Sequence, residues 1–314
     1  MNSFTPQHRY YSLDTYLKKR FGTKVFKIPL NAGFTCPNRD GTLSNQGCFF
    51  CSAMGSGEYA GNPDESLEKQ FYKIKNKMHE KWPEGKYIIY FQANTNTYAP
   101  LNQLQELYQA AISLDPNIVA LSIATRCDAI CDDTLEYLAA LNKRIPVWLE
   151  IGLQSKHEET MKRLNLGYTL AAFQTAIRKI QQKKIETVVH IINGLPGETK
   201  EMMIETARFL NTQNIQGVKI HSLYLVKGSV LGETFIKQPF PLLTLSKYVE
   251  IVAEQLAILQ PDIVIHRING DPPRDLFIAP QWTLKKFVIM NEIDKKMRQL
   301  NYVQGCKYNN KAFH

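Results

Sequence analysis

Short apolar segments alternate along most of the chain with segments in which apolar side chains recur every three or four residues. The first pattern is typical of buried strands and the second of amphipathic helices. The expected strands are residues 25–30, 87–93, 117–125, 147–155, 186–194 and 217–226, and the expected helices are residues 63–81, 101–114, 133–141, 170–182 and 198–211. Strands joined by helices in this way predict a parallel sheet with right-handed crossovers, closed or partly closed as a barrel.

The pattern changes after Gly228. Residues 229–243 are rich in proline and phenylalanine, and they precede an expected helix at 245–260, a strand with a proline-bounded turn at 263–275, and a helix at 284–300. No linker separates this part from the rest. We therefore expect three parts: a basic, aromatic N-terminal arm (1–24), a core barrel (25–228), and a C-terminal extension (229–314) that packs on the barrel and closes one side of it.

Composition indicates an ordinary globular protein. The 314 residues are 44% hydrophobic and 21% charged, which is neither a disordered nor a membrane composition. No apolar run approaches the ~20 residues of a membrane span, and the N-terminus lacks the apolar centre of a signal peptide. Six cysteines at irregular spacing do not form a disulfide framework in a chain of this length. We therefore expect a cytoplasmic protein in a reducing compartment, without a membrane partner.

The formal net charge of +9 and the pI near 9.1 are compatible with a nucleic-acid partner, because phosphate contacts supply most non-specific affinity. A solvated basic surface without such a partner explains the charge as well. The N-terminal arm, in which tyrosines alternate with lysines such as Lys18 and Lys19, is a candidate RNA contact. The alternative is a structural arm that covers one end of the barrel.

Three of the six cysteines lie in one glycine-rich stretch, Cys36-x11-Cys48-x2-Cys51. The short spacing lets two sulfurs face one centre, and Gly41 and Gly47 allow the long arm to bring the third beside them. Three thiolates without histidine suit iron and sulfide better than zinc, which in a structural site would need a fourth ligand. A zinc loop with a distant fourth ligand, or three unrelated buried cysteines, are the alternatives.

The segment CFFC, with an aromatic residue before the last cysteine, resembles the end of the radical S-adenosylmethionine (SAM) cluster motif. Eleven residues separate Cys36 from Cys48, whereas three is the usual number in that superfamily. The longer spacing resembles that of the YhcC/YtqA-like radical SAM proteins, which are relatives of the elongator type. The similarity includes GFTCPNRDG around Cys36, TR-x-D at 125–128, EIGLQS at 150–155 and GLPGET at 194–199. It spans roughly residues 20–230.

The resemblance implies a partial (β/α)6 barrel that binds a 4Fe-4S cluster and SAM. Cys36, Cys48 and Cys51 would bind three irons, and the fourth iron would bind the amino and carboxylate groups of SAM. Electron transfer from the reduced cluster would then cleave SAM to a 5′-deoxyadenosyl radical, which is chemistry supplied by the cofactors.

The candidate SAM contacts lie near the carboxyl ends of the expected strands, where the working face of such barrels is found. Gln92 and Asn94, with Thr95 beside them, suit the SAM amino group, or cap their own loop. Arg126 suits the SAM carboxylate, or forms an ion pair with Asp128. Glu150 lies inside an apolar strand, where accepting the two ribose hydroxyls would justify a carboxylate. Gln154, with Ser155, would line the adenosine or the substrate.

The turn GLPGET would touch adenine through its backbone, mainly at Gly194 and Pro196, and would lead into the next helix. Three polar residues on apolar strands, His190, Lys219 and His221, are more often core residues than substrate contacts. The remaining cysteines, Cys127, Cys131 and Cys306, would either hold a second cluster or be incidental thiols.

The resemblance implies a tRNA-modifying enzyme that acts at the wobble uridine and processes a carboxymethylaminomethyl group toward aminomethyl. Hydrogen abstraction from a side-chain carbon of the modified base would be followed by fragmentation. An electron donor such as flavodoxin or ferredoxin and a partner tRNA methyltransferase would be required. Two alternatives remain: a radical SAM enzyme for a small metabolite or a protein, and a zinc-stabilised RNA-binding module without redox chemistry.

Overall fold

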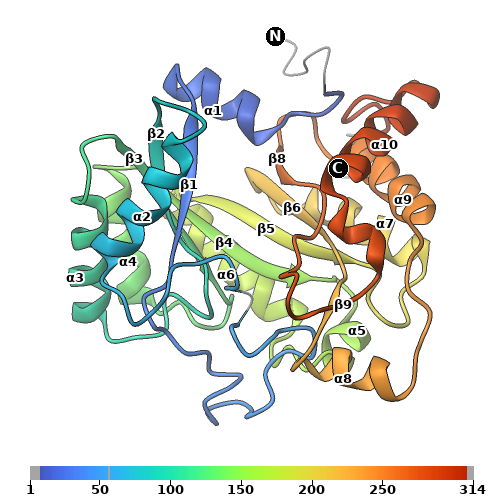
Figure 1. Ribbon diagram of the computed structural model, residues 1–314, viewed down its shortest axis with the longest axis horizontal. Helices are drawn as coiled ribbons and strands as arrows, with labels where there is room; N and C mark the ends of the chain where they lie inside the picture. Colours follow the sequence, from blue (N-terminus) through green and yellow to red (C-terminus); the bar gives the residue numbers. More distant parts are fainter. Residues whose placement is uncertain (1–7, 56, 310–314) are drawn as a thin grey trace.

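The computed structural model describes residues 8–55 and 57–309. Seven strands form one parallel sheet in the order β1-β2-β3-β4-β5-β6-β8. They are β1 (Val25–Leu30), β2 (Lys86–Phe91), β3 (Ile118–Thr125), β4 (Val147–Gln154), β5 (Glu186–Asn193), β6 (Gly217–Ser222) and β8 (Val264–Arg267). The sheet curls and the helices surround its outer side (Figure 1). The fold is therefore the partial α/β barrel that the sequence predicts.

Four of the seven outer helices in the described part of the chain begin at a capping side chain. The outer helices are α2 (Leu67–His79), α3 (Leu101–Ile112), α4 (Asp132–Asn142), α6 (Leu170–Gln182), α7 (Lys200–Leu210), α9 (Leu245–Ile258) and α10 (Lys286–Gln299). The side chains of Ser66, Thr169, Thr199 and Thr244 each accept a hydrogen bond from a backbone N–H of the first turn. Such caps satisfy N–H groups that have no partner within the helix.

Alternation along the strands separates an apolar core from a polar interior. Successive side chains of a strand point to opposite faces. On β1, Phe26, Ile28 and Leu30 belong to the main buried core under the helices, whereas Lys27 and Pro29 line a cavity on the inner side. The same division holds on the other strands of the sheet, so the inner side carries the chemistry of the molecule.

The N-terminal arm contains a helix that the sequence analysis did not predict, α1 (Leu13–Phe21). Its buried Leu17 packs in a cluster with Val25 and Trp148 at the amino ends of the strands. Two of its basic side chains form ion pairs within the protein, Lys18 with Asp14 at 2.8 Å and Arg20 with Glu186 at 2.6 Å. The helix thus covers the amino end of the barrel, and an RNA contact of the arm stays a prediction.

The chain beyond β4 differs from the prediction in three ways. The expected strand 217–226 is interrupted: β6 ends at Ser222, and β7 (Leu225–Val226) pairs antiparallel with β9 (Phe277–Ala279). Strand β8 pairs with β6, so the extension contributes a strand to the main sheet. Three short helices were not predicted: α5 (Glu158–Arg163), α8 (Val230–Lys237) and the 3₁₀ helix η1 (Gln281–Leu284). Leu223 and Leu225 leave the sheet because they pack in a second apolar cluster with Leu231 of α8.

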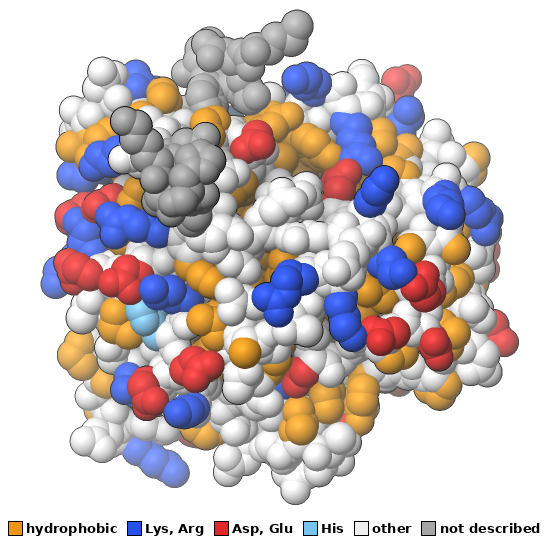
Figure 2. Space-filling view, turned by 180° about the vertical axis from the view of Figure 1, so that it is seen from behind, with side chains coloured by type: hydrophobic (Ala, Val, Ile, Leu, Met, Phe, Trp, Pro, Cys, Tyr) orange, Lys and Arg blue, Asp and Glu red, His pale blue; other side chains and the backbone are white. Residues whose placement is uncertain are grey.

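The surface mixes charges of both signs on the face seen from behind, where Lys and Arg side chains are interspersed with Asp and Glu (Figure 2). The net positive charge therefore does not form a single patch on that face. In the part of the chain that the structure describes, no helix combines the length and the apolar character that a membrane span requires.

Candidate active site

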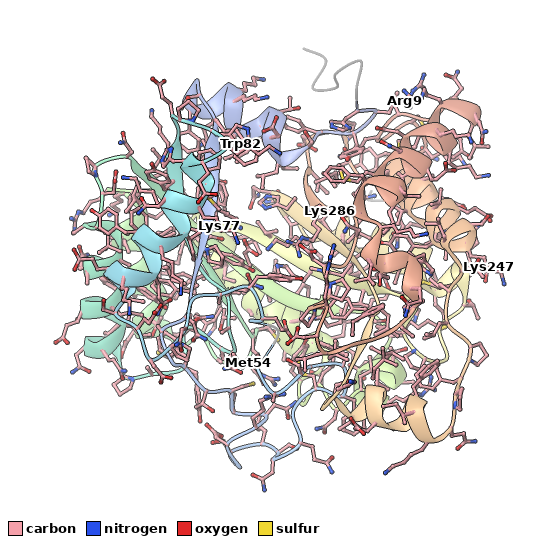
Figure 3. The ribbon with its side chains drawn as sticks, viewed as in Figure 1. Arg9, Met54, Lys77, Trp82, Lys247 and Lys286 are labelled. Atoms are coloured by element: carbon pink, nitrogen blue, oxygen red, sulfur yellow. The ribbon has the colours of Figure 1, made fainter. Side chains whose placement is uncertain are left out.

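A cavity of about 460 Å³ lies on the inner side of the sheet. All seven strands contribute lining residues, and the connection between β1 and α2 closes it on the side of the carboxyl ends. Met54 marks this connection in Figure 3, below the strands in that view. Because this is the end at which barrels of parallel strands place their reactive groups, the cavity is the candidate active site.

The three clustered cysteines line this cavity together. Backbone hydrogen bonds fold their loop back on itself, from Gly47 N–H to the Asn38 carbonyl at 2.6 Å and from Cys51 N–H to the Cys48 carbonyl at 2.9 Å. Gly47 has a φ of 68°, a conformation that glycine adopts without strain. The loop therefore brings Cys36, which is distant in sequence, to the same wall as the other two thiols.

The donor set fits an iron-sulfur cluster. All three cysteines are half-buried and free of disulfides, and Asn38 Nδ2 lies 3.5 Å from Cys48 Sγ, as expected for an N–H group that supports a thiolate. Among residues 8–55 and 57–309, no group of three Cys, His, Asp or Glu side chains converges on the position of one metal ion. A cluster requires less convergence, because each thiolate would bind a different iron atom.

Besides Glu150, which is described below, the predicted SAM contacts Gln92, Asn94, Arg126 and Gln154 line the cavity. Asn94 also donates from Nδ2 to the Phe34 carbonyl at 2.9 Å, which ties the end of β2 to the cysteine loop. These side chains come from three different strand ends, so the fold brings together residues that the sequence places up to about sixty positions apart.

Arg126 makes the ion pair that the sequence analysis considered as its alternative role. Its Nε and Nη2 donate to the two carboxylate oxygens of Asp128 at 2.9 and 2.8 Å, and its guanidinium lies 5.0 Å from the ring centroid of Tyr168. Asp128 thus orients the guanidinium at the cavity wall. The role of Arg126 toward the SAM carboxylate stays a prediction.

Thr95 provides an independent sign of a ligand on the same wall. Its side chain lines the cavity, and its buried Oγ1 has no hydrogen-bond partner among the described residues. Because buried polar atoms normally have partners, a bound polar group would complete this site.

The turn GLPGET does not reach the cavity. Neither Gly194 nor Pro196 is part of the lining. Gly194 has a φ of 90°, and a Cβ atom there would lie 3.1 Å from Leu243 Cδ1, while the Pro196 carbonyl accepts from Arg163 Nη1 at 2.7 Å. These contacts shape the turn before α7, and the role of Gly194 and Pro196 toward adenine stays a prediction.

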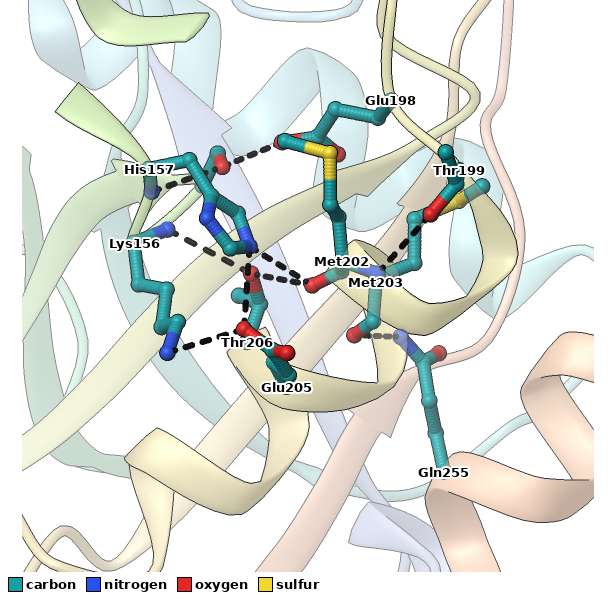
Figure 4. A network of polar contacts seen from close by, with 10 residues as sticks. Lys156, His157, Glu198, Thr199, Met202, Met203, Glu205, Thr206 and Gln255 are labelled. Atoms are coloured by element: carbon teal, nitrogen blue, oxygen red, sulfur yellow. Dashed lines mark hydrogen bonds and ion pairs between the residues drawn. The ribbon is translucent and has the colours of Figure 1, made fainter. Parts of the chain in front are cut away.

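Polar contacts fix this turn to its neighbours (Figure 4). The Ser155 hydroxyl donates to the Glu198 carboxylate, so Ser155 points away from the cavity that it was expected to line. Thr199 caps α7, and the helix starts one residue later at Lys200. Glu198 consequently lies before the helix and not within it.

Glu150 has different partners from those expected. Its Oε1 accepts from Lys27 and from Ser122 Oγ at 2.6 Å. Its Oε2 accepts from Lys219 and lies 2.8 Å from His190 Nε2. A carboxylate offers about four acceptor positions, and protein groups occupy them all. In this arrangement the ribose hydroxyls would have to replace one of these partners, and the role of Glu150 toward SAM stays a prediction.

Glu150 and its ionisable partners Lys27, His190 and Lys219 form an inner cluster. Burial has the largest single effect on the pKa of each of these groups. It lowers the pKa of Lys219 to about 7 and that of His190 to about 4, with attraction to Glu150 opposing both shifts. Burial also lowers the pKa of Lys27. For Glu150, burial raises the pKa, but the charges of Lys219 and Lys27 outweigh it and hold the pKa well below its usual range. Glu150 is therefore a carboxylate that two lysines share.

The other three cysteines do not come together. Cys127 is 5% exposed and packs in the main core, whereas Cys131 and Cys306 are exposed. The Cys131 thiol lies 3.1 Å from Thr134 Oγ1 at the start of α4. These positions match incidental thiols and not a second cluster.

Several lining residues were not predicted as site residues, notably Lys27, Tyr90, His266 and Arg267. The available signal was a polar residue inside an apolar strand, as with Lys27 in VFKIPL and Lys219 in GVKIHS. Lys27 was not predicted to have a role in the site, and Lys219 was expected to be a core residue. Their common partner, Glu150, becomes visible only when the strands are assembled.

Comparison with known proteins agrees with this geometry. Residues 41–210 match the Radical SAM superfamily, and residues 215–299 match the radical SAM C-terminal domain. The chain is 44% identical over 299 residues to the uncharacterized protein YtqA of Bacillus subtilis, covering 95% of this chain and 92% of that protein. It is 33% identical over 290 residues to protein YhcC of Escherichia coli K12, covering 92% of each.

Among solved structures, an archaeal Elp3 from Methanocaldococcus infernus superposes with a TM-score of 0.68 at 15% identity. The match covers 89% of this chain and 64% of the Elp3 chain, so it shows a shared barrel fold and leaves part of the Elp3 chain without a counterpart. Together with the sequence matches, it shows that this chain belongs to the radical SAM superfamily and, within it, to the YhcC/YtqA-like proteins.

Proposed function

We propose that this radical SAM enzyme modifies the wobble uridine of tRNA and processes a carboxymethylaminomethyl group toward aminomethyl. The observation that carries the choice of an RNA substrate is a second hollow of about 410 Å³ that shares Tyr59 and Asp271 with the active-site cavity. Arg274, Lys285, Lys286 and Phe287 also line it. A basic, aromatic surface thus lies directly beside the entrance to the candidate active site.

The chemistry of this hollow suits an unpaired RNA segment. Phe287 is 77% exposed and Tyr59 is 48% exposed, and aromatic faces of this kind stack on unpaired bases. The neighbouring lysines suit phosphates. In Figure 3, Lys286 lies near the middle of the view, whereas Lys247 lies at its edge. An anticodon loop that rests on the hollow could extend one base into the adjoining cavity.

The cofactor residues follow from the cavity lining. Cys36, Cys48 and Cys51 would hold the 4Fe-4S cluster, and Gln92, Asn94, Arg126 and Gln154 would contact SAM. Bound together, these groups supply a 5′-deoxyadenosyl radical. The protein orients them and excludes water, for which Tyr168 and Leu223 provide buried apolar surface beside the thiols. A flavodoxin or ferredoxin would supply the electron, and a tRNA methyltransferase would complete the modified base.

A zinc-stabilised RNA-binding module does not explain the match to the radical SAM superfamily over residues 41–210. A small-metabolite or protein substrate remains the competing assignment within the superfamily. With such a substrate, the basic hollow would have no role in catalysis. The next two experiments distinguish this assignment from a tRNA substrate.

We expect tRNA from cells that lack this gene to accumulate carboxymethylaminomethyl uridine and to lose the aminomethyl-derived nucleosides. Mass spectrometry of digested tRNA measures both. Restoring the intact gene should restore the profile, whereas a Cys48→Ala copy should not. An unchanged nucleoside profile in the deletion strain would reject tRNA as the substrate.

We expect the double variant Lys285→Ala/Lys286→Ala to bind tRNA more weakly and with a smaller salt dependence. Two lost phosphate contacts should reduce the slope of log affinity against log salt by about 1.4–1.8. Titration of purified protein with tRNA at several salt concentrations measures this slope. The charge-matched control Lys143→Ala/Lys247→Ala removes two exposed lysines that lie outside both hollows. An equal loss of slope in the control would assign tRNA binding to overall charge.

A further inference from the structure

The end of the cavity that Lys27, Glu150 and Lys219 line, here called the inner end, carries more positive than negative charge. The complete lining contains five Lys or Arg side chains, Lys27, Arg39, Arg126, Lys219 and Arg267, against three carboxylates, Glu58, Glu150 and Asp271. At the inner end, Lys27 and Lys219 share the single carboxylate of Glu150. Their ammonium groups lie 4.2 and 4.4 Å from the ring centroid of Tyr90. When both lysines are protonated, one carboxylate does not neutralise them and a positive charge remains.

Strand register adds a third cation to this end. His190 on β5 is paired with Lys219 on β6, and Lys219 is paired with Arg267 on β8. No ion pair of Arg267 occurs among residues 8–55 and 57–309. Apart from Glu150, the acidic lining residues are Glu58, which accepts from Ser52 Oγ at 2.5 Å, and Asp271, which lies in the connection after β8.

His266 supplies a donor without a partner at the same place. It lies on β8 beside Arg267 and lines the cavity. Its buried Nδ1 has no hydrogen-bond partner among the described residues, although buried polar atoms normally have one. Its ring packs edge-on against Trp148 at 5.7 Å, which restricts its orientation. An N–H at Nδ1 would be available to an incoming acceptor.

We propose that Lys219, His266 and Arg267 form a subsite for a carboxylate of the substrate. This inference rests on the proposed function, under which the anion is the terminal carboxylate of the carboxymethylaminomethyl group. A planar carboxylate accepts hydrogen bonds from a guanidinium, an ammonium and an imidazole N–H. It would neutralise the charge that Glu150 leaves uncompensated, and burying a charge is favourable only when a partner is present.

Position distinguishes this anion from two others that the enzyme would meet. The SAM carboxylate is expected near the cysteines, which follow the carboxyl end of β1, whereas Lys27 and Lys219 lie within their strands, three residues before Leu30 and before Ser222. RNA phosphates follow the nucleic-acid backbone at the surface. Lys219 is only 6% exposed, so a group that projects from a base reaches it more readily than a phosphate does.

The test compares tRNA that carries carboxymethylaminomethyl uridine with the same tRNA in which that carboxylate is converted to an amide. Loss of one charge-assisted contact should raise KM about 10- to 100-fold. We expect this rise for the wild-type holoenzyme on the amide, and for Arg267→Gln and Lys219→Met on the acid. Arg267→Lys should recover part of the affinity, and the control Lys247→Met should behave as wild type. Arg267→Gln remains informative if Lys219→Met fails to fold.

Four results would overturn the subsite. Equal KM values of the wild-type enzyme for acid and amide would show that the carboxylate is not recognised. Unchanged KM for the acid in both variants would show that Lys219 and Arg267 do not recognise the carboxylate. A rise in KM for SAM, without a rise for tRNA, would assign the anion to the methionine carboxylate. If the variants weaken the acid and the amide equally, the bound anion is an RNA phosphate.

A fragment experiment tests the subsite if tRNA proves not to be the substrate. N-methylglycine reproduces the terminal part of the carboxymethylaminomethyl group, and its amide lacks only the charge. We expect the wild-type protein to bind the acid at least about tenfold more tightly than the amide, as followed by ligand NMR, and Arg267→Gln to remove the difference. Failure of the wild-type enzyme on both tRNAs would reject the proposed function alone, whereas equal binding of both fragments would reject the subsite.

Proton uptake provides a readout that a purely structural lysine would not give. The groups facing Lys219 are Lys27, Tyr90, Glu150, His190, His221, His266 and Arg267. Because burial lowers the pKa of Lys219 to about 7, part of the population is uncharged near neutral pH, and a bound carboxylate favours the charged form. Calorimetry of N-methylglycine binding in buffers of different ionisation enthalpy should show proton uptake that Lys219→Met abolishes. Its persistence in that variant would contradict the role of Lys219.

Discussion

Replacing any one of Cys36, Cys48 and Cys51 with alanine is expected to remove both the iron of the protein and its ability to cleave SAM. Each thiolate would bind a different iron atom of the cluster, so the loss of one leaves a second iron without a protein ligand. The site has no spare thiol, because Cys127 is buried in the core and Cys131 is exposed at the start of α4. The effect should therefore be nearly complete for each single variant.

Anaerobic reconstitution followed by iron and sulfide analysis measures cluster content, and formation of 5′-deoxyadenosine measures SAM cleavage. Cys127→Ala is the matched control, because it also removes one thiol near the carboxyl ends of the strands, and it should retain iron and activity. Full iron content and full SAM cleavage in any of the three loop variants would contradict the ligand assignment. Loss of both in Cys127→Ala would extend the ligand set to the core cysteine.

Glu150→Gln is expected to be the most destabilising single substitution in the inner cluster. The glutamine has nearly the same size but leaves Lys27 and Lys219 buried without a counter-charge. Breaking a buried pair by removing one partner costs about 3–5 kcal/mol of unfolding free energy. Urea denaturation followed by circular dichroism measures this loss for wild type and variant at the same pH.

Glu250→Gln provides the control. Glu250 pairs with Lys200 at 2.6 Å, but its side chain is 48% exposed, and exposed pairs contribute at most about 1 kcal/mol. A loss in Glu150→Gln as small as that in Glu250→Gln would show that the lysines are not charged in the folded protein, and the charge argument for the carboxylate subsite would then fail.

The loss of unfolding free energy in Glu150→Gln, relative to wild type, should also depend on pH. The folded-state pKa of Lys219 lies below its unfolded value, about 7 against the ordinary lysine value of 10.5, so the folded protein binds fewer protons than the unfolded chain between these values. Stability therefore rises with pH across that window. Without Glu150 the lysine pKa values should fall further, and the difference from wild type should shrink as the lysines lose their protons.

The elements of the barrel could be read from the sequence because each depends on local pattern. The strands at 25–30 and 186–194 and the helix at 170–182 agree with the structure to within one residue at each end, since apolar runs and caps are local signals. Helix α1 was missed because its apolar residues are few, and its burial depends on Trp148, which is distant in the chain. The end of β6 was missed because the apolar pattern continues beyond Ser222 while the chain leaves the sheet.

Part of the candidate site could be read in the same way. The cysteine loop is a local motif, and the carboxyl ends of parallel strands meet at one edge whatever their register, so Gln92, Asn94, Arg126 and Gln154 line one cavity as expected. The sequence by itself thus determined the parallel barrel, the three thiols and the end of the barrel at which they lie, because these depend on spacing and periodicity within short segments. Only the tertiary structure decided that Lys27, Glu150 and Lys219 share one buried site. The reason is that strand register and sheet curvature set the contacts between residues more than one hundred positions apart, and no local pattern in the chain encodes that register.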